Sequence, residues 1–147
     1  MDNYDKALEK ALKLLKIRSH GSQELQRKLV LKGFNKETAL AVTDHLAGTG
    51  LINDAEYARN FLMNLIKYKT FGFYMLKAKL MQRGIDRELI NELLLDFSLE
   101  DEKAIALKLV ERKKEIDPVR LARSLSSKGF RTEVIKNILE NYKSLSS

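Results

Sequence analysis

A ten-residue pattern of leucines that ends in glycine recurs three times along the chain. The copies are LQRKLVLKGF from Leu25, LKAKLMQRGI from Leu76 and LARSLSSKGF from Leu121. Leucines four residues apart lie on one face of an α-helix, whereas a strand would alternate with period two. Because an internal repeat decides the architecture, the pattern predicts three copies of one helical unit.

Each copy carries the signature of a helix end. Glycine adopts the left-handed C′ conformation without the steric cost of a Cβ atom, and the next residue then packs against the residue four positions before the glycine. These features predict a Schellman motif in every copy. The predicted C′ glycines are Gly33, Gly84 and Gly129, and the residues four before them are Leu29, Leu80 and Leu125.

Apolar residues at helical spacing also lie on both sides of each copy, which predicts one helix before it and one after it. The helices after the glycines have apolar stripes at Ala39, Val42 and Leu46, at Ile90, Leu93 and Phe97, and at Ile135, Ile138 and Tyr142. The helices before the leucines have them at Ala7, Ala11 and Leu15, at Ala58, Leu62 and Leu65, and at Ala104, Leu107 and Val110.

The predicted fold is therefore all-α, with three tandem three-helix repeats that form an elongated array. The expected units are residues 1–49, 50–98 and 99–147. A unit of this size buries little surface alone, so we expect its neighbours to contribute apolar area.

Residues suited to N-capping precede several of these helices. We expect Asn35, Asp86 and Thr132 to cap the helices that follow the three glycines. Ser22 is the expected cap of the first middle helix, and Asp117, directly before a proline, that of the third.

Composition changes this picture little. Hydrophobic residues make up 44% of the 147 residues and charged residues 32%, which predicts a soluble protein with a core. Cysteine is absent, so disulfides and thiolate metal sites are excluded. The N-terminal segment mixes both charge signs without an apolar stretch, so we expect no signal peptide or membrane anchor and a cytoplasmic location.

Charge points to an anionic partner. The formal net charge is +7, and residues 25–36, 57–85 and 118–132, which include the middle helices of the repeats, contain basic residues and no acid. Clustered cations bind phosphates by releasing counterions, although a basic surface also arises without any ligand. The predicted partner-binding or nucleic-acid-binding cations are Arg27, Lys28, Lys32, Arg59, Lys67, Lys69, Lys77, Lys79, Arg83, Arg120, Arg123, Lys128 and Arg131.

Aromatic residues interleave with the middle basic segment. Phe71 and Phe73 flank Gly72 in a predicted turn and complete the set of candidate binding residues. Large apolar side chains in a turn either pack under a neighbour or are exposed for binding, and the sequence leaves both open. Tyr57 and Phe61 are one helical turn apart, which favours a place in the core.

No set of residues predicts catalysis, a metal or a cofactor. His20, in a turn, and His45, on an acidic helix, lack a partner at ligand spacing, so each is expected to be a surface or partly buried residue. Asp54 and Glu56 are better explained by helix capping, with Asn53 as the N-cap.

Three segments, in this order, resemble the RecX family. GLINDAEYAR from Gly50 to Arg59 is similar to the signature G-L-[LI]-[DN]-D-x-x-[FY]-A. KTFGFYMLKAKLMQRGI, which ends at Ile85, and RSHGSQELQRKLVLKGF, which ends at Phe34, resemble the signatures of the second and first repeats. The third repeat follows more loosely, and the likeness covers nearly the whole chain.

The resemblance implies a cytoplasmic regulator of RecA, with consequences for DNA repair, homologous recombination and the SOS response. It would bind the RecA filament on single-stranded DNA as a monomer, without a membrane. It would mostly inhibit the recombinase, ATPase and coprotease activities, by blocking filament extension or promoting disassembly. The ATPase would be that of RecA.

Two alternatives belong to other functional classes. One is a stand-alone helical protein that reads duplex DNA, which is disfavoured because an acidic helix follows each basic one. The other is a protein-interaction scaffold that uses the Phe71 turn. For the regulator we expect charge reversal at Lys77, Lys79 and Arg83 to weaken binding more than reversal at Lys136 and Lys143.

Overall fold

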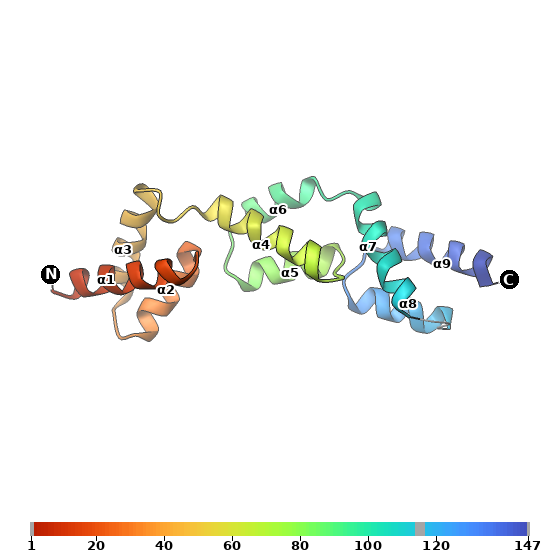
Figure 1. The fold of residues 1–147 in the computed structure, drawn as a ribbon, viewed down its shortest axis with the longest axis horizontal. Coiled ribbons are helices and arrows are strands. Elements are labelled where there is room, and N and C mark those ends of the chain that lie inside the picture. Colours follow the sequence, from red (N-terminus) through yellow and green to blue (C-terminus); the bar gives the residue numbers. More distant parts are fainter. Residues whose placement is uncertain (1, 114–116, 147) are drawn as a thin grey trace.

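The computed structural model describes residues 2–113 and 117–146, and the side chains of residues 3–113 and 117–142. Within these residues the chain forms nine α-helices and no strand, which confirms the all-α prediction (Figure 1). The helices are α1 (Asp2–Ile17), α2 (Ser22–Leu31), α3 (Lys36–Gly48), α4 (Asp54–Tyr68), α5 (Phe73–Gln82), α6 (Arg87–Leu95), α7 (Leu99–Arg112), α8 (Pro118–Ser127) and α9 (Thr132–Ser146).

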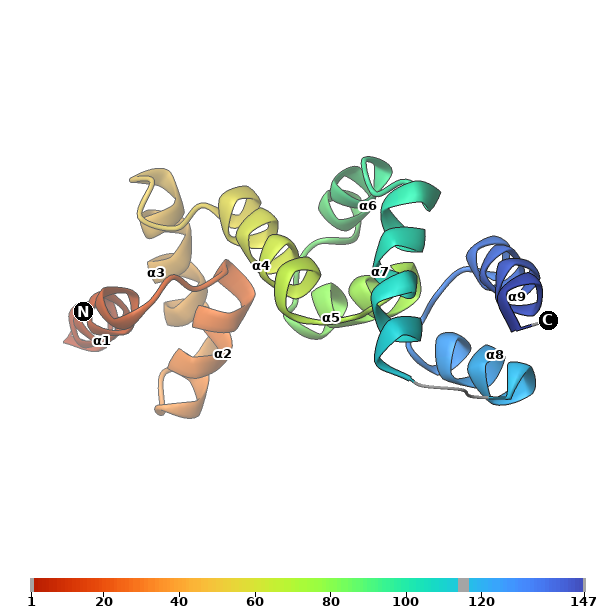
Figure 2. The ribbon, with the colours of Figure 1, turned by 45° about the vertical axis from the view of Figure 1, so that its right-hand side comes forward.

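The helices form three consecutive three-helix units, α1–α3, α4–α6 and α7–α9, and the most closely packed helix pairs belong to the same unit. Figure 1 shows the units following one another along one axis, with the two chain ends at opposite extremes of the molecule. The view in Figure 2 shows the same order. The predicted elongated array is confirmed, while the limits of the units as domains stay a prediction.

All three Schellman motifs are present. The backbone N–H of Phe34 donates to the carbonyl of Leu29 at 3.1 Å, and that of Gly33 to Val30 at 3.0 Å. The C′ glycines have φ angles of +104°, +75° and +84° at Gly33, Gly84 and Gly129. The corresponding C″ bonds of the other two units join Ile85 to Leu80 at 3.3 Å and Phe130 to Leu125 at 3.1 Å.

Three predicted N-caps are confirmed. The side chain of Asn35 accepts from the N–H of Thr38 at 2.7 Å, and that of Asp117 from Val119 at 3.1 Å. The side chain of Asn53 accepts from the N–H of Glu56 at 3.0 Å. These caps use atoms within three residues of each other, which is why local sequence sufficed to find them.

Three other capping predictions are wrong in whole or in part. Asp86 lies at the N-cap position of α6, but its side chain makes no capping hydrogen bond. Helices α2 and α9 begin at Ser22 and Thr132 themselves, so these residues lie inside the helices. At α2 the physical reason is tertiary, because an acid of the neighbouring unit, Asp54, accepts from the N–H of Ser22.

The buried apolar residues form two separate cores. The second and third units share one core, whereas the first unit has its own, so the expected exchange of apolar area joins only two of the three units. The core of the first unit is Ala7, Ala11, Leu25, Leu29, Ala39, Val42, Leu46 and Ile52. The shared core is Leu62, Leu76, Leu80, Ile90, Leu94, Phe97, Ile105, Ala106, Leu109, Leu121, Leu125, Phe130, Val134 and Ile138.

The predicted apolar stripe of α7 is wrong at Ala104 and Leu107 and is confirmed at Val110, which packs against the shared core. Ala104 is exposed and Leu107 is 43% exposed, while Ile105, Ala106 and Leu109 face the shared core. The buried face also includes Glu102, which lies one helical turn before Ile105. An acid at a core position hid this face from a search for apolar residues alone.

Candidate interaction site

The second and third units are joined by backbone contacts at Gly72 and Gly129. The N–H of Gly72 donates to the carbonyl of Lys128 at 2.9 Å, and that of Tyr74 to the carbonyl of Gly129 at 2.8 Å. A Cβ atom on Gly72 would lie 2.4 Å from the Cα of Phe130. The two backbones can approach this closely only because no side chain lies between them. The start of α5 is thereby held against the turn after α8.

A buried carboxylate completes this junction. Glu102 is fully buried, and its Oε2 accepts from the backbone N–H groups of Phe73 and Arg131, each at 2.9 Å. Its Oε1 accepts from Nε of Arg131 at 2.6 Å, and the same guanidinium donates to the carbonyl of Phe97 at 3.2 Å. Each oxygen of this buried charge therefore has a donor, which offsets the cost of removing it from water. The contacts tie together α7, α5 and the start of α9.

Phe71 and Phe73 lie at this junction, in different surroundings. Phe73 is half-buried against the shared core, and the guanidinium of Arg131 lies 4.4 Å from its ring centroid. Phe71 is half-buried against the shared core, and the ammonium groups of Lys79 and Lys128 lie 5.9 and 5.8 Å from its ring centroid. We call Phe71, Lys79 and Lys128 the Phe71 cluster. It combines an aromatic ring with cations from two units.

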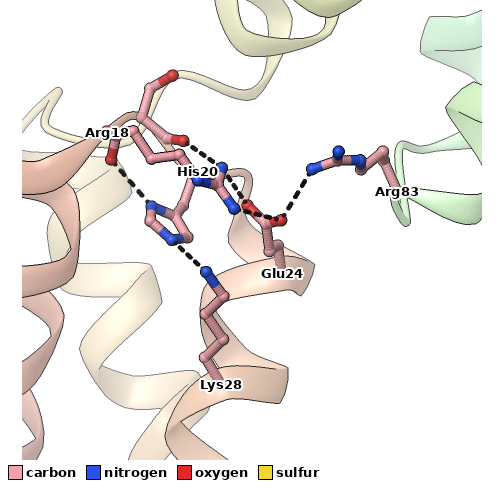
Figure 3. Close-up of polar contacts among 6 residues, drawn as sticks. Arg18, His20, Glu24, Lys28 and Arg83 are labelled. Carbon is pink, nitrogen blue, oxygen red and sulfur yellow. Dashed lines mark hydrogen bonds and ion pairs between the residues drawn. The ribbon is translucent and has the colours of Figure 1, made fainter.

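The first and second units meet through charged and polar groups. The guanidinium of Arg18 donates to both oxygens of Glu24, each at 3.1 Å, and Arg83 of the second unit donates to the same carboxylate at 3.2 Å (Figure 3). The carboxylate of Asp54 accepts from the N–H and the hydroxyl of Ser22, each at 2.7 Å. Burial raises the pKa of Glu24, but hydrogen bonds and charge from Arg18 outweigh it, so the pKa is lowered overall.

His20 supports this junction from within the first unit. It is only 3% exposed, which corrects the prediction of a surface or partly buried residue, whereas His45 is exposed as expected. Nδ1 donates to the carbonyl of Arg18 at 2.9 Å, and Nε2 accepts from the ammonium of Lys28 at 2.8 Å (Figure 3). A carbonyl can only accept and an ammonium can only donate, so this arrangement requires the neutral ring.

Family models match two of the three units. The model described as RecX, second three-helix domain, covers residues 53–94, and the model described as RecX, first three-helix domain, covers residues 7–46. The chain belongs to the RecX family. Both matched segments contain residues of the first junction, which is therefore built from RecX-type domains.

Two relatives match this chain over most of both lengths. Regulatory protein RecX of Prosthecochloris aestuarii is 31% identical over 142 residues, which is 92% of each chain. Regulatory protein RecX of Pelodictyon phaeoclathratiforme is 31% identical over 146 residues, 94% of this chain and 89% of the relative. These relatives are named as regulatory proteins.

Two solved RecX structures share the fold. The crystal structure of RecX from Lactobacillus salivarius superposes with a TM-score of 0.85 at 21% identity and covers 95% of this chain and 96% of its own. A second crystal structure of regulatory protein RecX has a TM-score of 0.80 at 25% identity and covers 92% of this chain and 70% of its own. The arrangement of three helical units is thus a RecX arrangement.

The other predicted binding cations of this RecX chain fall into two groups. Lys28, Arg83 and Arg131 bond to groups of the protein itself, and Arg83 also lies 4.7 Å from the ring centroid of Phe61. The exposed cations are Arg27, Lys32, Arg59, Lys67, Lys69, Arg120 and Arg123, while Lys77 is half-buried like the lysines of the Phe71 cluster. All remain predicted binding residues, but the first group also supports the fold.

Sequence reasoning missed the residues that join the units. Asp54 was assigned only to the capped N-terminus of its own helix, and neither Glu24 nor Glu102 was singled out. For Glu102 a signal existed, because it continues the stripe of Ile105 and Leu109. For Asp54 none existed, because its partner, Ser22, lies 32 residues away in the chain.

The described residues lack two other kinds of feature. Nowhere in residues 2–113 and 117–146 do three or more His, Cys, Asp or Glu side chains gather as metal ligands would. Across the same part of the chain, no helix combines the length and apolar character needed to cross a membrane.

Acidification is expected to destabilise the first unit of this RecX chain through His20. Burial, assisted by the charges of Lys28 and Arg18, lowers the pKa of His20 from 6.5, although its bond to the Arg18 carbonyl opposes this. Between the two pKa values, the unfolded chain therefore binds a proton at His20 that the folded chain does not bind. The His20 contribution to the free energy of unfolding is complete above pH 6.5 and is lost as the pH falls through the lowered folded-state pKa.

Urea unfolding of the native protein and of His20→Gln, measured at about pH 7.5 and about pH 5.5, tests this expectation. The native protein should lose more stability on acidification than the variant, which has no imidazole to titrate. An equal loss in both proteins would contradict the role assigned to His20.

Proposed function

We propose that this chain binds the RecA filament formed on single-stranded DNA and lowers its recombinase, ATPase and coprotease activities in the cytoplasm. It would act as a monomer that blocks filament extension or promotes disassembly. Membership of a family of regulatory proteins supports a regulatory role. The observation that carries the proposal is the Phe71 cluster, at the junction of two firmly joined units.

The chemistry of the cluster suits single-stranded DNA. An unpaired base stacks on an aromatic ring, and ammonium groups beside the ring bind the neighbouring phosphates. Lys79 and Lys128 belong to different units, and the bond from Gly72 to the Lys128 carbonyl at 2.9 Å holds those units together. Their spacing is thereby preset, which reduces the entropy lost on binding.

Charge reversal in the cluster is expected to weaken binding to RecA filaments on single-stranded DNA. Lys79→Glu combined with Lys128→Glu should lower the affinity at least about tenfold and reduce the salt slope by about 1.4, since each phosphate contact on a single strand contributes about 0.7. Titration at several salt concentrations, read by fluorescence anisotropy of labelled DNA, measures both quantities. Lys77 and Lys79 were predicted together with Arg83, but Arg83 pairs with Glu24 and would confuse the result.

Lys136→Glu is the matched control, because this lysine is exposed on α9. The side chain of Lys143, the other predicted control, lies outside the described residues. Equal losses from the cluster and from Lys136 would remove the case for a localised binding surface.

Inhibition is tested separately from binding. Purified protein in micromolar amounts should slow ATP hydrolysis by RecA on single-stranded DNA, and the cluster variant should do so less. If the native protein bound filaments without changing ATP turnover or strand exchange, the proposed inhibition would be wrong.

A further inference from the structure

The first unit contains a groove between its helices α2 and α3. Its volume is about 550 Å³. Val30 and Leu40 line it and are 38% and 49% exposed, although large aliphatic side chains are normally buried. The remaining lining residues are Gln23, Gln26, Arg27, Lys36 and Ala39.

Two sequence differences between the first unit and the other units account for this groove. Counted from the C′ glycine, Ala39 corresponds to Ile90 and Ile135, so the first unit has a small residue where the others have a large one. Leu40 corresponds in the same way to Asn91 and Lys136, so an apolar side chain is exposed only here. A missing isoleucine side chain leaves space, and an exposed leucine beside it gives that space an apolar wall.

The charge around the groove is of one sign. Arg27 and Lys36 line it, and no acidic residue does. Both cations are exposed, and Lys36 is the first residue of α3, where the positive end of the helix dipole adds to its charge. An apolar groove with cationic flanks is complementary to a segment that carries apolar side chains together with carboxylates.

We propose that this groove binds an acidic segment with apolar anchor residues on the polypeptide of the partner. The proposal rests on the proposed function, because the partner is then RecA, and it adds a division of labour. The first unit contacts the protein component of the filament, and the Phe71 cluster contacts the DNA. Helices α2 and α3 lie at the N-terminal end of the array, whereas α5 and α8 lie further along it (Figure 1).

Site-specific crosslinking tests the occupant. The chain has no cysteine, so Leu40→Cys can be labelled at one position with a benzophenone maleimide. Asn91→Cys is the matched control, because Asn91 is exposed at the corresponding position of the second unit. On RecA filaments assembled on single-stranded DNA, the label at residue 40 should react with RecA several times more efficiently than the label at residue 91. The crosslinked RecA peptide should contain Asp or Glu beside apolar residues.

A second variant gives the groove a residue of the second unit. Leu40→Asn places there the residue found at Asn91, so it is compatible with the unit, and it removes no charged group. The affinity for the filament should fall about tenfold, as is typical when an interface anchor is lost. Binding to single-stranded DNA without RecA should stay within about twofold of the native protein, because this variant leaves the Phe71 cluster intact.

The outcomes separate the two proposals. If the native protein does not bind the filament, both are wrong. If it binds, but residues 40 and 91 crosslink equally, the groove proposal alone is wrong. Crosslinks from residue 40 to DNA or to a second copy of this chain would also overturn it, as would unchanged filament affinity of Leu40→Asn.

Discussion

Replacing Gly129 by alanine is expected to lower the free energy of unfolding by about 4 kcal/mol and to separate the second and third units. The φ angle of Gly129 is +84°, which an alanine adopts only with strain. The new Cβ atom would also lie 2.3 Å from the backbone nitrogen of Met75. A backbone atom cannot avoid this clash by changing rotamer as a side chain can. The start of α5 must therefore move away from the turn that follows α8.

Gly33→Ala is the matched control for this substitution. Gly33 ends α2 in the same left-handed conformation, with φ of +104°, but nothing lies within 4 Å of an added Cβ atom. Its cost should be the conformational strain alone, about 1 kcal/mol. Urea unfolding followed by far-UV circular dichroism measures both losses, and small-angle X-ray scattering detects separation of the units. Equal losses for the two variants would show that the close approach at Gly129 contributes nothing.

Removal of the buried carboxylate is the second large effect. Glu102→Ala should lower the free energy of unfolding by about 3 kcal/mol, because it leaves the Arg131 guanidinium and two backbone N–H groups without their acceptor. The loss should appear in the shared core and not in the first unit, whose core is separate. Amide hydrogen exchange resolved by unit distinguishes these cases.

Glu100→Ala serves as the control for the charge. Glu100 lies in the same first turn of α7 and is exposed, so its removal should cost only about 0.5 kcal/mol of favourable interaction with the helix dipole. If Glu102→Ala cost no more than Glu100→Ala, the hydrogen bonds of Glu102 would not stabilise the junction.

The two junctions between the units differ in strength. The second and third units share a core, two backbone hydrogen bonds and the bond from the Phe73 N–H to the buried carboxylate of Glu102. The first and second units are joined by the ion pair of the partly exposed Arg83 with Glu24 and by the Asp54 contact. Exposed ion pairs contribute little each and are screened by salt, so the first junction is the weaker one. The proposed protein-binding groove and the DNA-binding cluster lie on opposite sides of it.

The sequence predicted those features whose partners are close along the chain. The Schellman motifs at Gly33, Gly84 and Gly129 join residues five apart, and the caps at Asn35 and Asn53 join residues three apart. For such features the residue types and their spacing contain all the necessary information. The three-helix units and their order follow from the same local signals.

Predictions failed where the partner lies in another unit or turn. Ser22 is bonded to the neighbouring Asp54, and His20 is buried between the Arg18 carbonyl and Lys28. On α7, Glu102 occupies a core position that only the approach of α5 and α9 makes favourable. Polar residues at these positions are predicted to be exposed, because a prediction of burial from sequence relies on hydrophobicity alone.

The sequence by itself determined three glycine-ended helical units and an excess of positive charge in their middle helices, because both depend on local spacing. Only the tertiary structure decided that the second and third units share a core and that the first unit has its own. It alone placed two lysines beside Phe71 and a groove beside Leu40. The reason is physical: contacts between units depend on how closely two backbones approach, and that distance is set by the packing of every unit at once.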